Sequence, residues 1–377
     1  MMRRPQIALL ADGKRLHLQD GPIDLIVEAR GGAADIAAAH GAATLRFDGL
    51  LDELCAELPA LRQAADPVRC SLQGRVARRM HQAVAPFASD HFITPMAAVA
   101  GAVAEEILAA MLDTAPLQRA YVNNGGDIAL YLADGEQLTV GLLDRPERRG
   151  VMQLTTIDSA DRSRGIATSG RHGRSFSLGI ADAVTVLART AAQADAAATI
   201  IANAVDLPAH PAIRRCPANE LQPDSDLGGR LVTREVGALS EAEIDAALGA
   251  GLACARRLLA AGLIDGAALR LQGETVVAGT RLRLSNARQS DRERHPDFLP
   301  SFRDEPPVGG SRLMAQARDP SGSERDEGWV PGSDVQRARS ALDARPGTTA
   351  AGICAFDRRW RGEVGAKRPF QENPWAP

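Results

Sequence analysis

The feature that most constrains the fold is a series of short strand-like runs between residues 119 and 188, flanked by two alanine-rich segments. Apolar runs bounded by turn residues predict strands over 119–123, 127–132, 137–143, 151–157, 164–168 and 182–188. The flanking segments, "TPMAAVAGAVAEEILAAMLD" and "TAAQADAAATIIANAV", indicate helices, and their many alanines allow close packing against a sheet. The pattern predicts an α+β domain with a mixed sheet and packed alanine-rich helices.

Hairpin turns and helix caps predict further elements. "RLHLQDGPIDLIVEA" indicates two strands around Asp20–Gly21, and "AALRLQGETVVAG" indicates a hairpin around Gly273. Apolar residues at 50, 51, 54, 58 and 61 have the spacing of one face of a helix. Two residue pairs have capping-box spacing and mark helix starts, namely Thr190 with Gln193 and Ser240 with Glu243.

The composition changes near residue 286. Residues 291–377 contain ten of the 22 prolines and no sustained hydrophobic period. Such a segment buries too little apolar surface to offset its ordering entropy. We therefore predict one domain over 1–285 and a low-complexity, disordered tail over 286–377. An alternative is that the tail results from translation of a GC-rich coding strand beyond its original reading frame.

Bulk composition argues against several classes of protein. A net charge of -3 and an aromatic content of 3% do not favour nucleic-acid binding. The apolar runs are too short for a secretory signal or a membrane span. The five cysteines are scattered singly, which suggests neither a zinc site nor a disulfide framework. We expect a cytoplasmic protein without nucleic-acid or membrane partners.

The stretch "YVNNGGDIAL" is the first candidate for a ligand site. Asn124–Gly125 is a strong hairpin signal, because both residues tolerate positive φ, and a plain turn is one interpretation. The second glycine, Gly126, would let a ligand approach the backbone closely. Asp127 could then accept a hydrogen bond from a ribose or a ring N–H.

The bend "RGIATSGRHGRSFS" (164–177) is the second candidate. Its glycines allow successive amides to point the same way and bind an anion, and Arg171, His172 and Arg174 add positive charge. A solvated basic loop is the alternative. The composition favours an anion site, such as one for the phosphate of a nucleotide.

Asp195 and Thr199 form the third candidate. They are four residues apart on a predicted helix, so their Cβ atoms should lie about 5–6 Å apart on one face. A carboxylate and a hydroxyl so placed can ligate a hard cation such as Mg²⁺. The alternative is structural, with Asp195 complementing the helix dipole. Two acids in "PDSDLGG" (223–229) are interpreted as turn residues.

The order of these motifs resembles a known family. "VNNGGDIAL", "IATSG" and "AVTVLARTAAQADAAATIIANA", preceded by "AAVAGAVAEE", resemble the ApbE-like superfamily, whose characterised members are FAD:protein FMN transferases. The similarity covers roughly residues 90–210, and the chain looks most like an uncharacterised cytosolic branch. The resemblance implies an ApbE-like, T-fold-related mixed sheet.

The resemblance also implies a site. Mg²⁺ would be held by the Asp195 carboxylate, the Thr199 hydroxyl and the backbone carbonyl of Ala100. In the family the metal polarises the FAD pyrophosphate, a Thr or Ser hydroxyl of a target protein attacks, and AMP leaves. The residues expected to bind the flavin nucleotide are Gly125, Gly126, Asp127, Ala167, Thr168, Ser169, Gly170, Arg171 and His172. No catalytic residue is assigned.

Two departures from the family pattern keep other functions open. Gly101 stands where the family has a lysine, and "RHGRSFSLGIAD" replaces a histidine-containing family stretch. One hypothesis is that Arg171, His172 and Arg174 replace the lost lysine electrostatically. The predicted partners are a nucleotide ligand, a protein acceptor and a second copy of the chain. The alternatives to a transferase are a non-catalytic flavin or pterin binder and a scaffold that dimerises through its alanine-rich helices.

Overall fold

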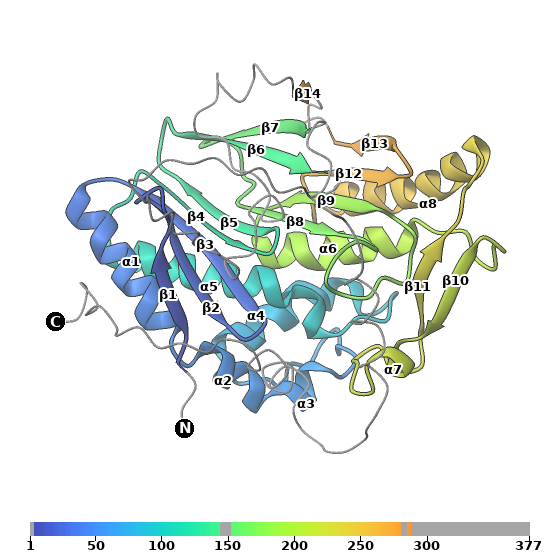
Figure 1. Ribbon diagram of the computed structural model, residues 1–377, viewed down its shortest axis with the longest axis horizontal. Helices are drawn as coiled ribbons and strands as arrows, with labels where there is room; N and C mark the ends of the chain where they lie inside the picture. Colours follow the sequence, from blue (N-terminus) through green and yellow to red (C-terminus); the bar gives the residue numbers. More distant parts are fainter. Residues whose placement is uncertain (1–3, 144–151, 280–284, 288–377) are drawn as a thin grey trace, which may run out of the picture. The chain divides into compact units, whose positions relative to one another are not determined.

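The computed structural model describes residues 4–143, 152–279 and 285–287, and it confirms the α+β class. Its largest sheet has nine strands in the order β1-β2-β3-β4-β5-β8-β9-β12-β13 (Figure 1). The strands are β1 (Gln6–Leu9), β2 (Leu16–Asp20), β3 (Ile23–Arg30), β4 (Arg119–Asn124), β5 (Asp127–Leu132), β8 (Gly165–Ser169), β9 (Ala183–Ala188), β12 (Gly266–Leu271) and β13 (Glu274–Ala278). Each neighbouring pair is antiparallel, whereas the sequence suggested a mixed sheet.

Two smaller sheets accompany the large one. Their strands are β6 (Gln137–Leu143), β7 (Met152–Asp158) and β14 (Ser285–Ala287) in one, and β10 (Ile213–Pro217) and β11 (Leu231–Val236) in the other. The helices are α1 (Ala33–Phe47), α2 (Leu50–Ala56), α3 (Leu58–Leu61), α4 (Arg75–Val84), α5 (Val99–Thr114), α6 (Ala191–Ala204), α7 (Ala218–Leu221) and α8 (Glu241–Ala260), with the 3₁₀ turns η1 (Ala85–Phe87) and η2 (Pro95–Ala98).

The alternation of side chains along the central strands separates two apolar layers. Ala129, Ala167 and Val186 point to the side where α5 and α6 lie, which we call the helix face. Ile128 and Ile166 point to the opposite side, the far face, and pack with residues of β6 and β7. The period of two along a strand thus decides which side chains can reach α5 and α6.

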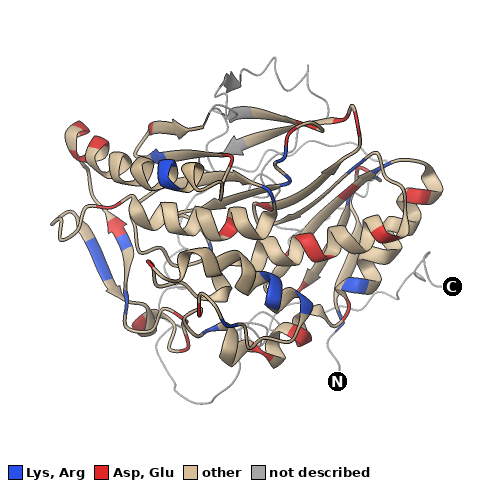
Figure 2. Cartoon of the chain, turned by 180° about the vertical axis from the view of Figure 1, so that it is seen from behind, with Lys and Arg blue, Asp and Glu red and all other residues tan. Residues whose placement is uncertain are grey.

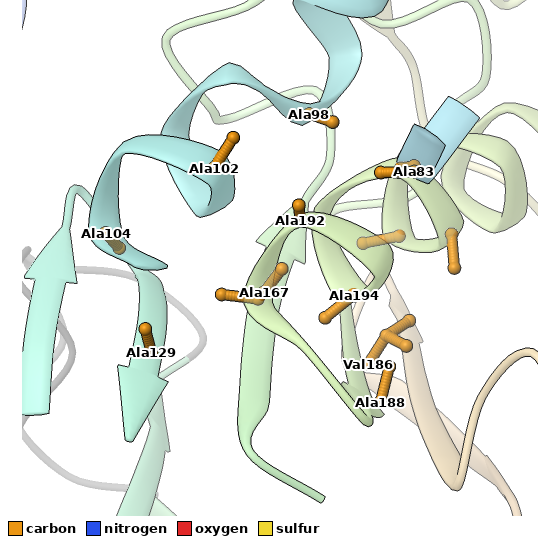
Figure 3. Close-up of a cluster of buried hydrophobic side chains, with 14 of the residues drawn as sticks. Ala83, Ala98, Ala102, Ala104, Ala129, Ala167, Val186, Ala188, Ala192 and Ala194 are labelled. Atoms are coloured by element: carbon orange, nitrogen blue, oxygen red, sulfur yellow. The ribbon is translucent and has the colours of Figure 1, made fainter. Parts of the chain in front are cut away.

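Small residues let α6 approach both α5 and β8 closely. Figure 3 shows alanines of α5, α6 and the central strands gathered in one cluster. A Cβ on Gly101 of α5 would lie 2.3 Å from the carbonyl oxygen of Ala191. A Cβ on Gly165 of β8 would lie 2.1 Å from the carbonyl oxygen of Thr190. The alanine-rich faces of these helices are therefore used for packing within the chain.

Buried ion pairs fix α5 against its neighbours. Glu106 of α5 is buried and accepts from Arg46 Nε and Arg79 Nη1, each at 2.8 Å. Burial raises the pKa of Glu106, but the hydrogen bonds from the two arginines outweigh it and the net pKa is lowered. The adjacent Glu105 accepts from the Ala192 amide at 2.7 Å and so ties the start of α6 to α5. Figure 2 shows acidic and basic residues interspersed along the elements.

Most predicted elements are confirmed, and the exceptions have local causes. Both hairpins are present, and Ser240 and Glu243 form a complete capping box. The predicted helix over 50–61 is broken into α2 and α3 at Glu57, just before Pro59, which lies in the first turn of α3. Helices α1 and α4 were not predicted. Of the predicted tail over 286–377, Asn286 and Ala287 belong to β14, which pairs with β7, and the remaining residues lie outside the described residues.

Contrary to the expectation that every apolar run is too short for a membrane span, the stretch Pro95–Thr114 is long and apolar enough to cross a membrane by length and composition alone. In the structure it forms η2 and α5, and most of the α5 residues from Gly101 to Met111 are buried against the sheet and neighbouring helices. We therefore interpret it as a core helix of this domain.

Candidate functional site

The side chain of Asp195, a residue of α6, contacts the first residues of α5. Its Oδ2 accepts from the Gly101 amide at 3.1 Å, and the Ala100 amide also donates to the carboxylate. The residue preceding α5, Ala98, provides no side-chain cap. Asp195 therefore acts as an N-terminal cap supplied by a neighbouring helix, and it satisfies amides that α5 leaves without an internal partner.

The pKa of Asp195 is raised well above its ordinary value. Burial is the largest cause, and the nearby Asp127 carboxylate adds to it, while the amides of Gly101 and Ala100 lower it by less. Within the described part of the chain Asp195 has no ion-pair partner. The two carboxylates of Asp195 and Asp127 thus lie near each other, an arrangement that a proton or a bound cation on Asp195 would relieve.

Further oxygen atoms lie beside Asp195. Thr199 is one turn further along α6 and, like Asp195 and Ala100, is half-buried. The Ala100 carbonyl accepts from Asn124 Nδ2 at 3.2 Å, which links the start of α5 to the end of β4. Asp195 and Ala100 are therefore brought together at the α5–α6 contact, and Thr199 lies one helical turn from Asp195. We call these three residues with Asp127 the oxygen cluster.

The predicted glycine turn is a two-residue hairpin loop. Gly125 and Gly126 have φ of 67° and 111° and join Asn124 to Asp127, which pair across the turn. The Gly126 amide donates to Asn123 Oδ1 at 2.9 Å. Asp127 begins β5 on the helix face, and its Oδ1 accepts from the Thr168 amide at 3.2 Å. This bond connects the glycine turn to the end of β8.

The residues at the end of β8 and just after it point in different directions. Ala167 is packed on the helix face, and Ser169 shares this face by the alternation of the strand. Thr168 instead has its hydroxyl on the far face, 2.9 Å from the hydroxyl of Thr185. Gly170 is the first residue after the strand. A Cβ on Gly170 would lie 2.5 Å from the Asp182 carbonyl oxygen. The amide of Thr168 reaches the oxygen cluster through its hydrogen bond to Asp127.

Two cationic side chains of the bend, Arg171 and His172, share one acidic partner. Arg171 pairs with Asp182 through Nε at 2.8 Å and Nη2 at 2.6 Å, and His172 Nε2 lies 3.2 Å from the same oxygen. Asp182 is buried, and its other oxygen accepts from the Gln272 amide at 2.6 Å. Arg171 and His172 therefore offset the charge of a buried acid.

The lysine position of the family pattern is closed in this chain. The nearest atoms to a Cβ on Gly101 belong to the backbone of Ala191 and Ala192. No side chain fits there without separating α5 from α6. The absence of lysine is thus a consequence of close helix packing, which the sequence alone did not reveal.

Other candidate ligands have structural roles. Within the described ranges, no group of three or more His, Cys, Asp or Glu side chains could hold a metal ion. The segment "PDSDLGG" forms turns, as predicted, and Asp226 accepts from Thr94 at 2.5 Å while Asp224 pairs with Arg62 at 3.0 Å. The oxygen cluster differs from a His/Cys site because a hydroxyl and a carbonyl complement its carboxylates.

Sequence reasoning missed three residues that shape the site. Asn124 was interpreted only as a turn residue, although it also binds the Ala100 carbonyl. Glu105 and Asp182 were not singled out, because their partners, Ala192 and Arg171, are joined to them only by tertiary contacts. The alternation along β8 could have predicted that Thr168 and Ser169 point to opposite faces.

Comparison with known proteins gives curated relatives and solved structures. A UPF0280 protein of Methanopyrus kandleri is 39% identical over 167 residues, covering 41% of this chain and 59% of the relative. A UPF0280 protein of Archaeoglobus fulgidus is 37% identical over 140 residues, covering 37% and 54%. The match thus spans little more than half of these relatives. The apo flavinyl transferase ApbE of Pseudomonas stutzeri aligns with a TM-score of 0.40 and 13% identity, over 75% of this chain and 97% of that one.

The family comparison covers most of the domain. A family model described as "AbpE bacteria" matches residues 7–277, a range that includes the glycine turn, the bend and the oxygen cluster. The chain therefore belongs to this ApbE-like family.

Proposed function

We propose that this chain is an Mg²⁺-dependent protein that handles a flavin nucleotide, as a relative of the FAD:protein FMN transferases. In this proposal the oxygen cluster holds the metal, and the glycine turn and the bend after β8 line the nucleotide. The acceptor would be a Thr or Ser hydroxyl of a cytoplasmic protein. The observation that carries the proposal is the position of the Asp195 carboxylate, which accepts from the Gly101 amide at the start of α5, beside Ala100 and near Asp127.

The donor atoms of the oxygen cluster suit magnesium. A carboxylate has about four lone-pair sites, and the amides of Gly101 and Ala100 account for two of those on Asp195. The Ala100 carbonyl has a second lone pair besides the one that accepts from Asn124. Mg²⁺ prefers oxygen ligands and completes its shell with water and phosphate oxygens. When bound, it would neutralise negative charge on the phosphates of the nucleotide.

The protein's own contribution is orientation. The start of α5 fixes the Asp195 carboxylate, and Asn124 fixes the carbonyl of Ala100. The glycine turn carries no side chains, so a nucleotide can approach its backbone. The Thr168 amide holds Asp127 at the first position of β5, where its carboxylate can accept from a ribose or a ring N–H.

A specific observation favours a second candidate, a binding module that holds a flavin or pterin without chemical turnover. The closed position of Gly101 excludes a lysine there. Arg171 and His172, proposed as its electrostatic substitutes, lie against the buried Asp182 instead. The oxygen cluster is retained in both candidates, so metal-dependent binding is common to them.

Purified full-length protein incubated with FAD and Mg²⁺ separates the two candidates. A transferase releases AMP, whereas a binding module gains thermal stability from the ligand without AMP release. Asp195→Asn should abolish either response. Asp245→Asn is the matched control, because Asp245 occupies the same fifth position of its own helix, α8, and is exposed. Equal responses of wild type and Asp195→Asn would refute the proposed site.

A further inference from the structure

Three cationic side chains lie within four residues of the bend, but their tertiary positions differ. Arg171 and His172 turn toward Asp182 at the start of β9. Arg174 instead reaches the glycine turn, where its guanidinium lies against Gly125. Its Nη1 also donates to the carbonyl of Pro22 at 3.1 Å. Arg174 thus bridges the β2–β3 turn, the β4–β5 turn and the bend after β8.

The guanidinium lies close to the glycine backbone. A Cβ built on Gly125 would be 3.4 Å from Nη2, 3.6 Å from Cζ and 3.9 Å from Nε of Arg174. These similar distances show that the guanidinium packs along Gly125 rather than touching it with one atom. Any residue with a side chain would press against this guanidinium and would also be strained by the φ of 67°.

This location places a positive charge next to the oxygen cluster. Gly125 and Gly126 are followed directly by Asp127, whose carboxylate raises the pKa of Asp195. A ligand lying on the glycine turn would therefore have a guanidinium at one end and the oxygen cluster at the other. A guanidinium has five N–H donors in a planar fork, which matches the oxygens of a phosphate.

We propose that Arg174 is the residue that recognises the anionic group of the ligand and selects phosphorylated flavins over riboflavin. This inference rests on the proposed function and adds the ligand class that this site selects. It also assigns different roles to the three cations, with Arg174 reading the ligand and Arg171 and His172 balancing Asp182.

The test compares the dissociation constants of FMN and riboflavin, measured by quenching of flavin fluorescence at saturating Mg²⁺. Wild type should bind FMN more tightly, and Arg174→Gln should reduce this preference by about tenfold or more, as expected for loss of a charge-assisted hydrogen bond. Riboflavin affinity should stay unchanged. Arg174→Lys should retain part of the preference, because it keeps the charge and loses the planar fork.

Arg162→Gln is the matched control. Arg162 is also an exposed arginine; it lies just before β8 and pairs with Asp265 at 2.6 Å. The Arg162→Gln variant should keep the wild-type preference for FMN. An unchanged preference in Arg174→Gln, or an equal loss in both variants, would overturn the role of Arg174. If wild type binds neither FMN, FAD nor riboflavin, the proposed function fails together with this inference.

Discussion

Gly101 gives the sharpest test of how α5 and α6 are packed. In Gly101→Ala the added Cβ would lie 2.3 Å from the Ala191 carbonyl oxygen, 2.4 Å from its carbon and 2.7 Å from the Ala192 nitrogen. These are backbone atoms of α6, so they cannot rotate away as a flexible side chain would. The two helices would have to separate, against the packing of a dense alanine-rich interface.

The magnitude follows from two opposing effects. Overpacking a core costs about 1–3 kcal/mol, and the backbone contacts favour the upper end of this range. Alanine gains up to about 1 kcal/mol over glycine in a helix. The net loss of unfolding free energy should be about 2 kcal/mol. For a domain of this size that corresponds to a fall in Tm of about 4–8 °C.

Urea unfolding followed by circular dichroism measures this loss. Gly41→Ala is the control, because Gly41 lies inside α1 and a Cβ there would meet no atom within 4 Å. That control should gain about 0.5–1 kcal/mol. Gly101→Ala should also weaken the response to Mg²⁺, since the Gly101 amide holds Asp195. If Gly101→Ala is as stable as wild type, α5 and α6 do not pack as closely at Gly101 as described here.

Three further predictions concern charged groups. Asp195→Asn should raise the Tm of the metal-free protein, and the gain should grow with pH. The pKa of Asp195 is raised in the folded state, so wild type loses stability as the pH rises toward that pKa. A lower Tm of the variant in differential scanning fluorimetry would contradict this. Hydrogen bonds from Ser240 and His210 lower the pKa of Glu243 to about 2, so wild type should lose stability as the pH falls from about 4.5 to about 2, and Glu243→Gln should lose less over that range. Asp182→Ala should destabilise the domain by about 3–5 kcal/mol, because Arg171 would lose the partner of a largely buried ion pair, and an unchanged midpoint in urea would refute this role.

The sequence predicted those parts of the fold that local patterns determine. The strand runs and the glycine turn were found because alternation and turn chemistry act over a few residues. The capping box of Ser240 and Glu243 was found for the same reason. The break at Glu57 was missed because the apolar stripe continues past Pro59 with helical spacing.

The candidate site was predicted only in part. Asp195 and Thr199 share one helix, so their spacing alone placed them together. The different roles of Arg171 and Arg174 depend on Asp182, Gly125 and Pro22, which are brought close only by the sheet. The cap that Asp195 provides to α5 joins residues 94 positions apart, a contact that no local spacing predicts.

Isothermal titration of Mg²⁺ into FAD-saturated protein tests the proposed metal site most directly. Wild type should bind one Mg²⁺ more tightly than free FAD does. Asp195→Asn should lose most of this affinity, Thr199→Val should weaken it, and Asp245→Asn should match wild type. Mg²⁺ affinity that is the same in wild type and Asp195→Asn would contradict a metal site at the contact of α5 and α6.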